Sequence, residues 1–214
     1  MLATAAIALT LATAGPNIDN PYFPLPVGRH WTYHVDKQRD VVTVTDQTKL
    51  IANGVTARVV HDVVTEKGAP AEVTDDYYAQ DPKGNVWYLG EATATYRHGK
   101  PSSTEGSFEA GVGGARAGIV MPAHPRVGMR YRQEFFKGHA EDRAEIVSLN
   151  ERVKVPLGRY RHTLMTLETS ALEPDVLEAK FYARGVGQVL AVDLSGDTAR
   201  ELLVATGGGR TRRG

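Results

Sequence analysis

The feature that most constrains this fold is a two-residue alternation of apolar and polar side chains along most of the chain. It is seen at Trp31, Tyr33 and Val35, which alternate with polar residues, and it is accompanied at residues 77–91 by two aromatic-rich runs, 77–80 and 86–89, that flank the Pro, Gly and Asn of residues 81–85. Two such runs around a short turn-forming cluster predict a β-hairpin. Asn53-Gly54 follows another apolar run and predicts a second hairpin. The chain is therefore expected to consist of strands joined by short turns.

Further strands are expected at residues 31–35, 41–45, 55–65, 103–110, 129–136, 140–149, 151–155, 161–169, 176–183, 186–193 and 199–205. No segment has the pattern of an amphipathic helix. About a dozen consecutive strands would expose long edges unless the sheet closed or folded over itself. The predicted fold is all-β, an antiparallel meander forming a curved half-barrel or barrel with little helix. A two-sheet sandwich is the alternative.

The N-terminal residues predict export. Residues 2–14 are apolar and end in Ala12-Thr13-Ala14, the small-x-small pattern of a signal-peptidase site, although no positive charge precedes the apolar run. The run is too short to cross a bilayer, which needs about 20 apolar residues. Residues 1–14 are therefore expected to be a signal peptide, and the protein to be secreted, periplasmic or on the cell surface.

Four further predictions complete the expected organisation. Residues 15–27 are rich in proline, which disfavours helix and central strand, so they predict an extended strap whose Tyr22, Phe23 and Leu25 lie against the core. Residues 28–206 are expected to form a single β domain, and the glycine- and arginine-rich residues 207–214 a flexible basic tail. Residues 111–125, crowded with Gly and Pro, predict a long loop or a bulged stretch at the mouth of the barrel.

Composition narrows the function classes. Lys plus Arg equals Asp plus Glu at 25 each, so no overall field favours binding to nucleic acid. Cysteine is absent, which excludes disulfides, thiol nucleophiles and thiolate metal sites. His30 and His34 would lie about 13 Å apart on a strand, too far for one ion. No metal or cofactor is expected, and no catalytic motif identifies an enzyme.

Two stretches carry a resemblance to a known family. The pattern YAQD-x-x-GNVWY-x-GE at residues 78–91 and the pattern EAGV-x-GA-x-x-GI-x-MPA at residues 109–123 resemble a family of secreted bacterial β-proteins without an assigned activity. The likeness covers most of residues 20–204. Such proteins are loosely similar in fold to the curved-sheet carriers that hold lipid tails in the periplasm, which implies a fold and not a function.

The candidate binding site is a cluster of charged and aromatic side chains. Arg132 and Glu134 are two apart on an expected strand and would share a face, close to Glu141 and Asp142 at the start of the next strand. If that face is concave, the carboxylates surround one guanidinium and bind a polar group; if it is convex, they form a solvated ladder. The full candidate set is Arg132, Glu134, Glu109, Glu141, Asp142, Glu178, Tyr182 and Trp87.

Three functions remain open from the sequence. The first is binding of an apolar or amphipathic small molecule, such as a lipid, in a concave β-sheet cavity. In this case the protein is expected to be a monomer, and peripheral contact with a membrane fits the same function. The second is a carboxylate-dependent hydrolase or lyase that uses Glu134 with Glu141 or Glu178. The third is a cell-surface structural domain without a small ligand.

Overall fold

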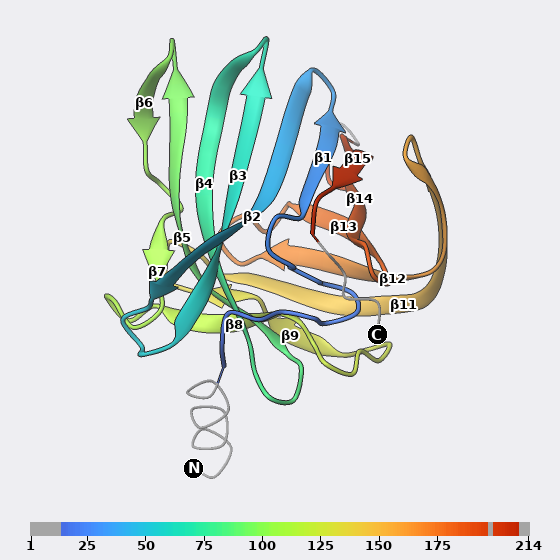
Figure 1. Cartoon of the computed structure of the whole chain (residues 1–214), viewed down its shortest axis with the longest axis horizontal. Coiled ribbons are helices and arrows are strands. Elements are labelled where there is room, and N and C mark those ends of the chain that lie inside the picture. The colour runs from blue at the N-terminus through green and yellow to red at the C-terminus, as the bar shows by residue number, and fades with distance from the viewer. Residues whose placement is uncertain (1–13, 197–198, 210–214) are drawn as a thin grey trace.

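The computed structural model describes residues 14–196 and 199–209, and these residues form an antiparallel sheet that curls into a nearly closed barrel (Figure 1). No helix occurs in this part of the chain, so the predicted all-β barrel fold is confirmed. None of the described residues therefore supplies a helix with the length and apolarity to span a membrane. The expected signal peptide falls almost entirely on residues 1–13, outside the described residues.

The fifteen described strands follow one another with short connections. They are β1 (His30–Val35), β2 (Gln38–Leu50), β3 (Thr56–Glu66), β4 (Ala69–Gln80), β5 (Val86–Arg97), β6 (Lys100–Ser103), β7 (Phe108–Glu109), β8 (Arg116–Met121), β9 (Arg130–Arg132), β10 (Glu134–Phe135), β11 (Asp142–Val155), β12 (Gly158–Ser170), β13 (Leu177–Ala183), β14 (Gly187–Asp193) and β15 (Arg200–Gly207). Their order in the sheet is β10-β8-β5-β4-β3-β2-β1-β15-β14-β13-β12-β11-β9, with β6 and β7 paired to β5 beside this path.

The barrel closes through a strand that is split between two partners. The two ends of the sheet, β9 and β10, are separated in sequence only by Gln133, and β9 pairs with β11 while β10 pairs with β8. Gly118 of β8 lies directly against this junction, because a Cβ on it would come within 2.3 Å of the backbone of Gln133. Only a residue without a side chain allows this approach. We call the β9–Gln133–β10 segment, packed on Gly118, the closure seam.

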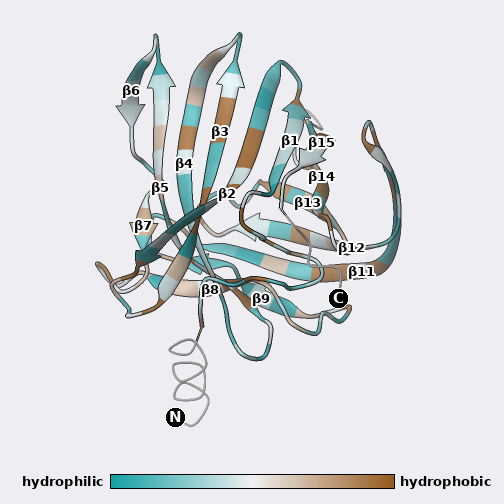
Figure 2. Cartoon of the chain, in the orientation of Figure 1, coloured by the Kyte–Doolittle hydropathy of each residue, from teal (hydrophilic) through white to brown (hydrophobic). Residues whose placement is uncertain are grey.

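Alternation along the strands creates two apolar layers. The inner face carries the main core, which includes Val44, Val60 and Leu203. The outer face of β3, β4 and β5 carries a smaller cluster around Ile51, Tyr77 and Leu89. Figure 2 accordingly shows hydrophobic and hydrophilic segments interspersed along these strands.

The proline-rich segment crosses one end of the barrel (Figure 1). Tyr22 and Leu25 are buried in the main core, and Phe23 packs against it. The side-chain amide of Asn20 donates to the carbonyl oxygens of Gly84, at 2.9 Å, and Pro122, at 3.2 Å. These bonds fix the strap to the β4–β5 turn and to the end of β8.

Some local expectations differ from the structure. Residues 111–125 are not one loop, because β8 lies within them and pairs with both β5 and β10. The strands expected at 140–149 and 151–155 are one strand, β11, which begins at Asp142 and whose register shifts near Ser148 and Glu151. The expected strand at 103–110 is replaced by the end of β6 and the two-residue β7, because Thr104 to Ser107 form a turn.

Candidate functional site

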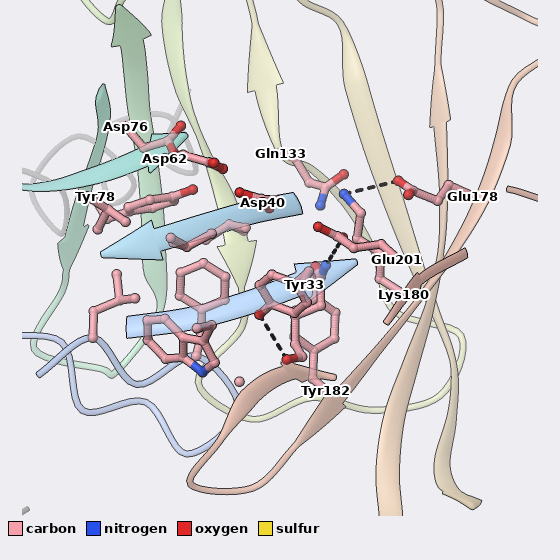
Figure 3. A pocket seen from close by; sticks show the side chains of 18 residues that line it. Tyr33, Asp40, Asp62, Asp76, Tyr78, Gln133, Glu178, Lys180, Tyr182 and Glu201 are labelled. Atoms are coloured by element: carbon pink, nitrogen blue, oxygen red, sulfur yellow. Dashed lines mark hydrogen bonds and ion pairs between the residues drawn. The ribbon is translucent and has the colours of Figure 1, made fainter. Parts of the chain in front are cut away.

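A cavity of about 300 Å³ lies inside the barrel, under the strap (Figure 3). Its walls come from the strap, from β1 to β4, from β8 and from β13 to β15. The lining residues are Phe23, Leu25, Trp31, Tyr33, Asp40, Val42, Val60, Asp62, Asp76, Tyr78, Val120, Gln133, Glu178, Lys180, Tyr182, Gly187, Gln188 and Glu201. Every second residue of a strand faces the cavity, and the inward-facing residues form two groups. We call the group of carboxylates the polar level, and the group of aromatic and aliphatic side chains next to the strap the apolar level.

The polar level is built from carboxylates on adjacent strands. Asp40, Asp62 and Asp76 come from β2, β3 and β4, and Figure 3 shows the three side chains gathered on one side of the cavity. In the strand register Asp62 lies opposite Val42 and Asp76 lies opposite Val60. Residues opposite each other, or two apart on one strand, share a face of the sheet. All three carboxylates therefore point inward.

The apolar level lies two residues further along the same strands. Trp31 lies opposite Val42, just as Tyr33 lies opposite Asp40. Tyr78, two residues from Asp76, packs on Phe23 of the strap with ring centroids 5.3 Å apart. The end of the cavity beneath the strap is thus aromatic and aliphatic.

Asp40 is the most constrained carboxylate of the polar level. Its residue is only 6% exposed, and its Oδ1 atom has no hydrogen-bond partner in the described structure. Oδ1 of Asp62 is likewise buried and unpartnered. Burial, and after it the neighbouring Asp62, raise the pKa of Asp40 to about 11. The empty cavity therefore favours a protonated, neutral Asp40 at physiological pH.

The other carboxylates of this level are also shifted toward the neutral form. Burial raises the pKa of Asp76 well above its usual value, against the lowering effect of a 2.6 Å hydrogen bond that the Tyr88 hydroxyl donates. Burial also raises the pKa of Glu201, whose Oε2 accepts a 2.6 Å hydrogen bond from the Gln188 amide. Packing like charges in a poorly solvated space disfavours ionisation of each.

Lys180 provides the one ammonium group among the residues that line this cavity, and it is already paired. Its Nζ lies 3.0 Å from Glu168 and 3.1 Å from Glu178. Burial acts to lower the pKa of Lys180, but the two carboxylates reverse this and raise it well above its usual value. Lys180 therefore stays charged and neutralises its own partners rather than the aspartates across the cavity.

A second, wider cavity of about 790 Å³ shares Glu178 and Lys180 with the first. Glu134 and Asp142 lie in its wall. Burial, and then the charge of Asp142, raise the pKa of Glu134 to about 8. This space continues the acidic interior away from the strap.

The structure separates Arg132 from Glu134, contrary to the expected shared face. Arg132 is exposed, and its guanidinium lies 4.2 Å from the ring centroid of Phe135. Glu134 is half-buried and lines the second cavity. The reason is the closure seam, because the change of partner strand at Gln133 breaks the regular alternation that the expectation assumed.

Three other residues of the predicted set lie away from the cavities. Glu109 pairs with Lys49 at 2.8 Å; the Lys49 and Ala52 hydrogen bonds outweigh partial burial and lower its pKa. Glu141 accepts a hydrogen bond from the Gly138 N–H in a turn. Trp87 is buried, but it donates to Asp81 at the β4–β5 turn rather than forming a cavity wall.

Four of the predicted residues do meet at the interior. Glu178 and Tyr182 line the first cavity, and Glu134, Asp142 and again Glu178 line the second. The prediction omitted the residues that dominate the polar level: Asp40, Asp62, Asp76, Lys180 and Glu201. The available signal was an acidic residue two positions from an inward-facing apolar one, as in Asp40–Val42 and Asp76–Tyr78, but both aspartates lie just before the strands expected at residues 41–45 and 77–80.

No protein-family model matches the chain, and no curated protein matches it. Two solved structures are similar to it. One is a predicted exported protein with a YmcC-like fold from Bacteroides fragilis, with 14% identity over 87% of this chain and 98% of that chain and a TM-score of 0.49. The other is a predicted lipoprotein from Parabacteroides distasonis, with 11% identity over 88% of this chain and 99% of that chain and a TM-score of 0.47.

Proposed function

We propose that this protein is an exported binding protein whose barrel holds one amphipathic small molecule. The observation that carries the proposal is the two-level cavity, which places an aromatic and aliphatic end beneath the strap next to buried, unpartnered carboxylate oxygens. Ligand sites are typically concave and mostly apolar, with a few polar groups that fix orientation. The volume of about 300 Å³ falls at the small end of such sites. A structural domain without a ligand would gain nothing from buried carboxylates that lack partners.

Export is part of the proposal and rests on the N-terminal sequence. The apolar run that ends in Ala12-Thr13-Ala14 suits cleavage by a signal peptidase. The absence of cysteine is compatible with an oxidising compartment, since no thiol is available for unwanted pairing.

Two variants on adjacent residues test whether the cavity binds. Val42→Phe fills the apolar level, whereas Val41→Phe adds the same bulk to the opposite face of β2. In a Trp87→Phe background, the fluorescence of Trp31 in the cavity wall reports on binding of 2-phenylethanol or 2-phenylethylamine. We expect saturable binding of at least one probe, lost in Val42→Phe and kept in Val41→Phe. Equal binding by the two variants would rule out the cavity as the site.

Native mass spectrometry of the protein purified from its own host provides the second measurement. We expect a bound small molecule that is present in the wild type and in Val41→Phe but absent from Val42→Phe. Such a molecule would also identify the natural ligand by its mass.

A carboxylate-dependent hydrolase is the second candidate, and one observation favours it. Glu134, with a pKa raised to about 8, keeps its proton near neutral pH and lies beside Asp142 in the wider cavity. A general acid needs such a pKa. Turnover of a glycoside or ester substrate that is lost in Glu134→Gln would support this candidate, and unchanged turnover would exclude Glu134 from the chemistry.

A further inference from the structure

We infer that the ligand of the inner cavity is an organic cation, a small ammonium compound whose charged group contacts Asp40 and Asp62 and whose apolar part lies under the strap. This inference rests on the proposed binding function and names the chemical class of its ligand. Three independent features of the cavity support it: its charge balance, its unpartnered oxygen atoms and the arrangement of its apolar level.

The charge balance of the cavity is strongly acidic although the chain as a whole is neutral. Five carboxylates line it, against the single ammonium of Lys180. Because Lys180 lies between Glu168 and Glu178, at 3.0 and 3.1 Å, its charge is already neutralised. The remaining carboxylates are Asp40, Asp62, Asp76 and Glu201. In the empty barrel, burial keeps most of these carboxyl groups protonated. A cation that enters stabilises their ionised form, whereas an anion finds no free counter-charge, so a cation is favoured over an anion.

The unpartnered oxygens provide the second, independent feature. Oδ1 of Asp40 and Oδ1 of Asp62 are both shielded from solvent and accept no hydrogen bond from any described residue. Buried polar atoms are nearly always hydrogen-bonded. In the empty barrel the proton that Asp40 retains serves as the donor between Asp40 and Asp62, and a ligand with N–H groups can take the place of that proton. An alkylammonium group carries three N–H donors in a compact head. It can supply a charge-assisted bond to each aspartate at once.

The arrangement of the apolar level favours an organic cation over a metal ion. No group of three or more His, Asp or Glu side chains among the described residues is placed to hold a metal. The space of about 300 Å³ holds roughly ten water molecules, far more than one ion needs. Trp31, Tyr78 and Phe23 provide aromatic surface beside the carboxylates. Such rings suit both an apolar chain and the edge of a cationic head.

A matched set of three probes tests the inference: 2-phenylethylamine, 2-phenylethanol and 3-phenylpropanoate. They share the phenylethyl group and differ in charge, because an aliphatic amine is protonated and a carboxylic acid ionised at neutral pH. Calorimetric titration at neutral pH is expected to show the amine binding at least about tenfold more tightly than the alcohol. The propanoate is expected to bind more weakly than either.

Two variants locate the charge that selects the amine. Asp40→Asn and Asp62→Asn keep the side-chain shape but remove the acidic group, so each should reduce the preference for the amine over the alcohol to about threefold or less. Asp75→Asn is the matched control. Asp75 is the neighbour of Asp76 on β4, but it points to the other face of the sheet, where it contacts His61 at 2.7 Å. This control is expected to retain the full preference.

The outcomes separate this inference from the proposed function. Binding of the alcohol as tightly as the amine, with loss of both in Val42→Phe, would keep the binding function and overturn the cationic ligand. Failure of all three probes to bind would overturn both. Saturable binding of calcium chloride that disappears in Asp40→Asn would replace the organic cation by a metal ion and overturn the inference. A preference for the amine that survives in both aspartate variants would also overturn the assigned contacts.

Discussion

Asp81 shows how much local structure one buried carboxylate can organise. It accepts hydrogen bonds from the backbone N–H groups of Lys83 and Asn85, at 2.9 and 3.0 Å, and from the Asn85 side chain at 2.8 Å. It also accepts a 3.0 Å bond from the indole of Trp87. The β4–β5 hairpin is therefore fixed at its turn by one residue as well as by its aromatic pairs.

Trp87→Ala should destabilise the protein strongly. The side chain is buried, with 6% of the residue exposed. Its loss leaves a cavity and removes one of the two hydrogen bonds that Oδ2 of Asp81 accepts. We expect the free energy of unfolding to fall by about 3–5 kcal/mol in urea titrations. Trp87→Phe, which keeps most of the volume and loses only the hydrogen bond, should cost less. A loss under about 1 kcal/mol in Trp87→Ala would contradict the burial of this residue.

Arg132→Ala should have a small effect on stability. The guanidinium is exposed and lies over Phe135, outside both cavities that contain the carboxylates. Exposed cation–π contacts contribute about 0.5–1 kcal/mol. Unfolding in urea is therefore expected to change by no more than about 1 kcal/mol, and binding of 2-phenylethylamine to remain unchanged. A loss of several kcal/mol would place Arg132 among the buried carboxylates after all.

The residues that the sequence identified well are those whose contacts are local. The β4–β5 hairpin has Tyr78 opposite Tyr88, as its aromatic runs predict. The inner site depends on β1 to β4 lining the same cavity as β13 and β15, which no local pattern encodes. Even the inward side of a strand cannot be assigned from alternation when a break such as Gln133 intervenes. The acidic pocket therefore became visible only with the sheet register.

At the level of elements, the barrel depends on its weakest junction. The hairpins β2–β3 and β3–β4 are long, whereas β10 and β8 share only two residue pairs, Glu134 with Ala117 and Phe135 with Arg116. Residues 111–125 looked like a loop because their Gly and Pro content is a local signal. Their pairing with β5 and β10 is a tertiary effect, which explains why β8 was not predicted.

Gly118→Ala tests the closure seam. An added Cβ would lie 2.3 Å from the backbone of Gln133 and 2.6 Å from the carbonyl oxygen of Arg132, so the strands must separate. We expect a loss of about 3 kcal/mol or more, at the upper end of overpacking effects. Gly158→Ala is the matched control, because that glycine begins β12 and has no atom within 4 Å of an added Cβ. Equal unfolding midpoints for the two variants would contradict the proposed role of the seam.

At the scale of the whole molecule, a chain without net charge conceals an uneven distribution. Acidic side chains line both cavities of the barrel, although Lys plus Arg equals Asp plus Glu over the whole chain. Burial of these carboxylates raises the pKa of Asp40, Asp76, Glu134 and Glu201. At neutral pH the folded protein therefore holds protons that the unfolded chain has already released, and folding is linked to proton uptake.

This linkage predicts that stability falls as pH rises. The pKa of Asp40 is near 3.8 in the unfolded chain and about 11 in the folded protein, so within that window the folded state binds one more proton at this site. The free energy of unfolding should then decrease with pH, by at most about 1.4 kcal/mol per pH unit for each such group. The groups that face Asp40 are Asp62, Glu201 and Tyr33. The carboxyl groups of Asp62 and Glu201 disfavour its ionisation, and Tyr33 is buried beside it.

Asp40→Asn isolates this contribution. The amide keeps the shape of the protonated acid but cannot ionise. Between about pH 6 and about pH 8, the free energy of unfolding of the variant should therefore fall less steeply with pH than that of the wild type, by up to about 1.4 kcal/mol per pH unit. Urea titrations of the wild type, Asp40→Asn and the outer-face control Asp75→Asn at these two pH values measure it. The control should keep the wild-type slope. A wild type that gains stability toward pH 8, or an Asp40→Asn variant with an unchanged slope, would mean that Asp40 is ionised in the folded barrel. The cavity would then have to contain a counter-charge other than Lys180.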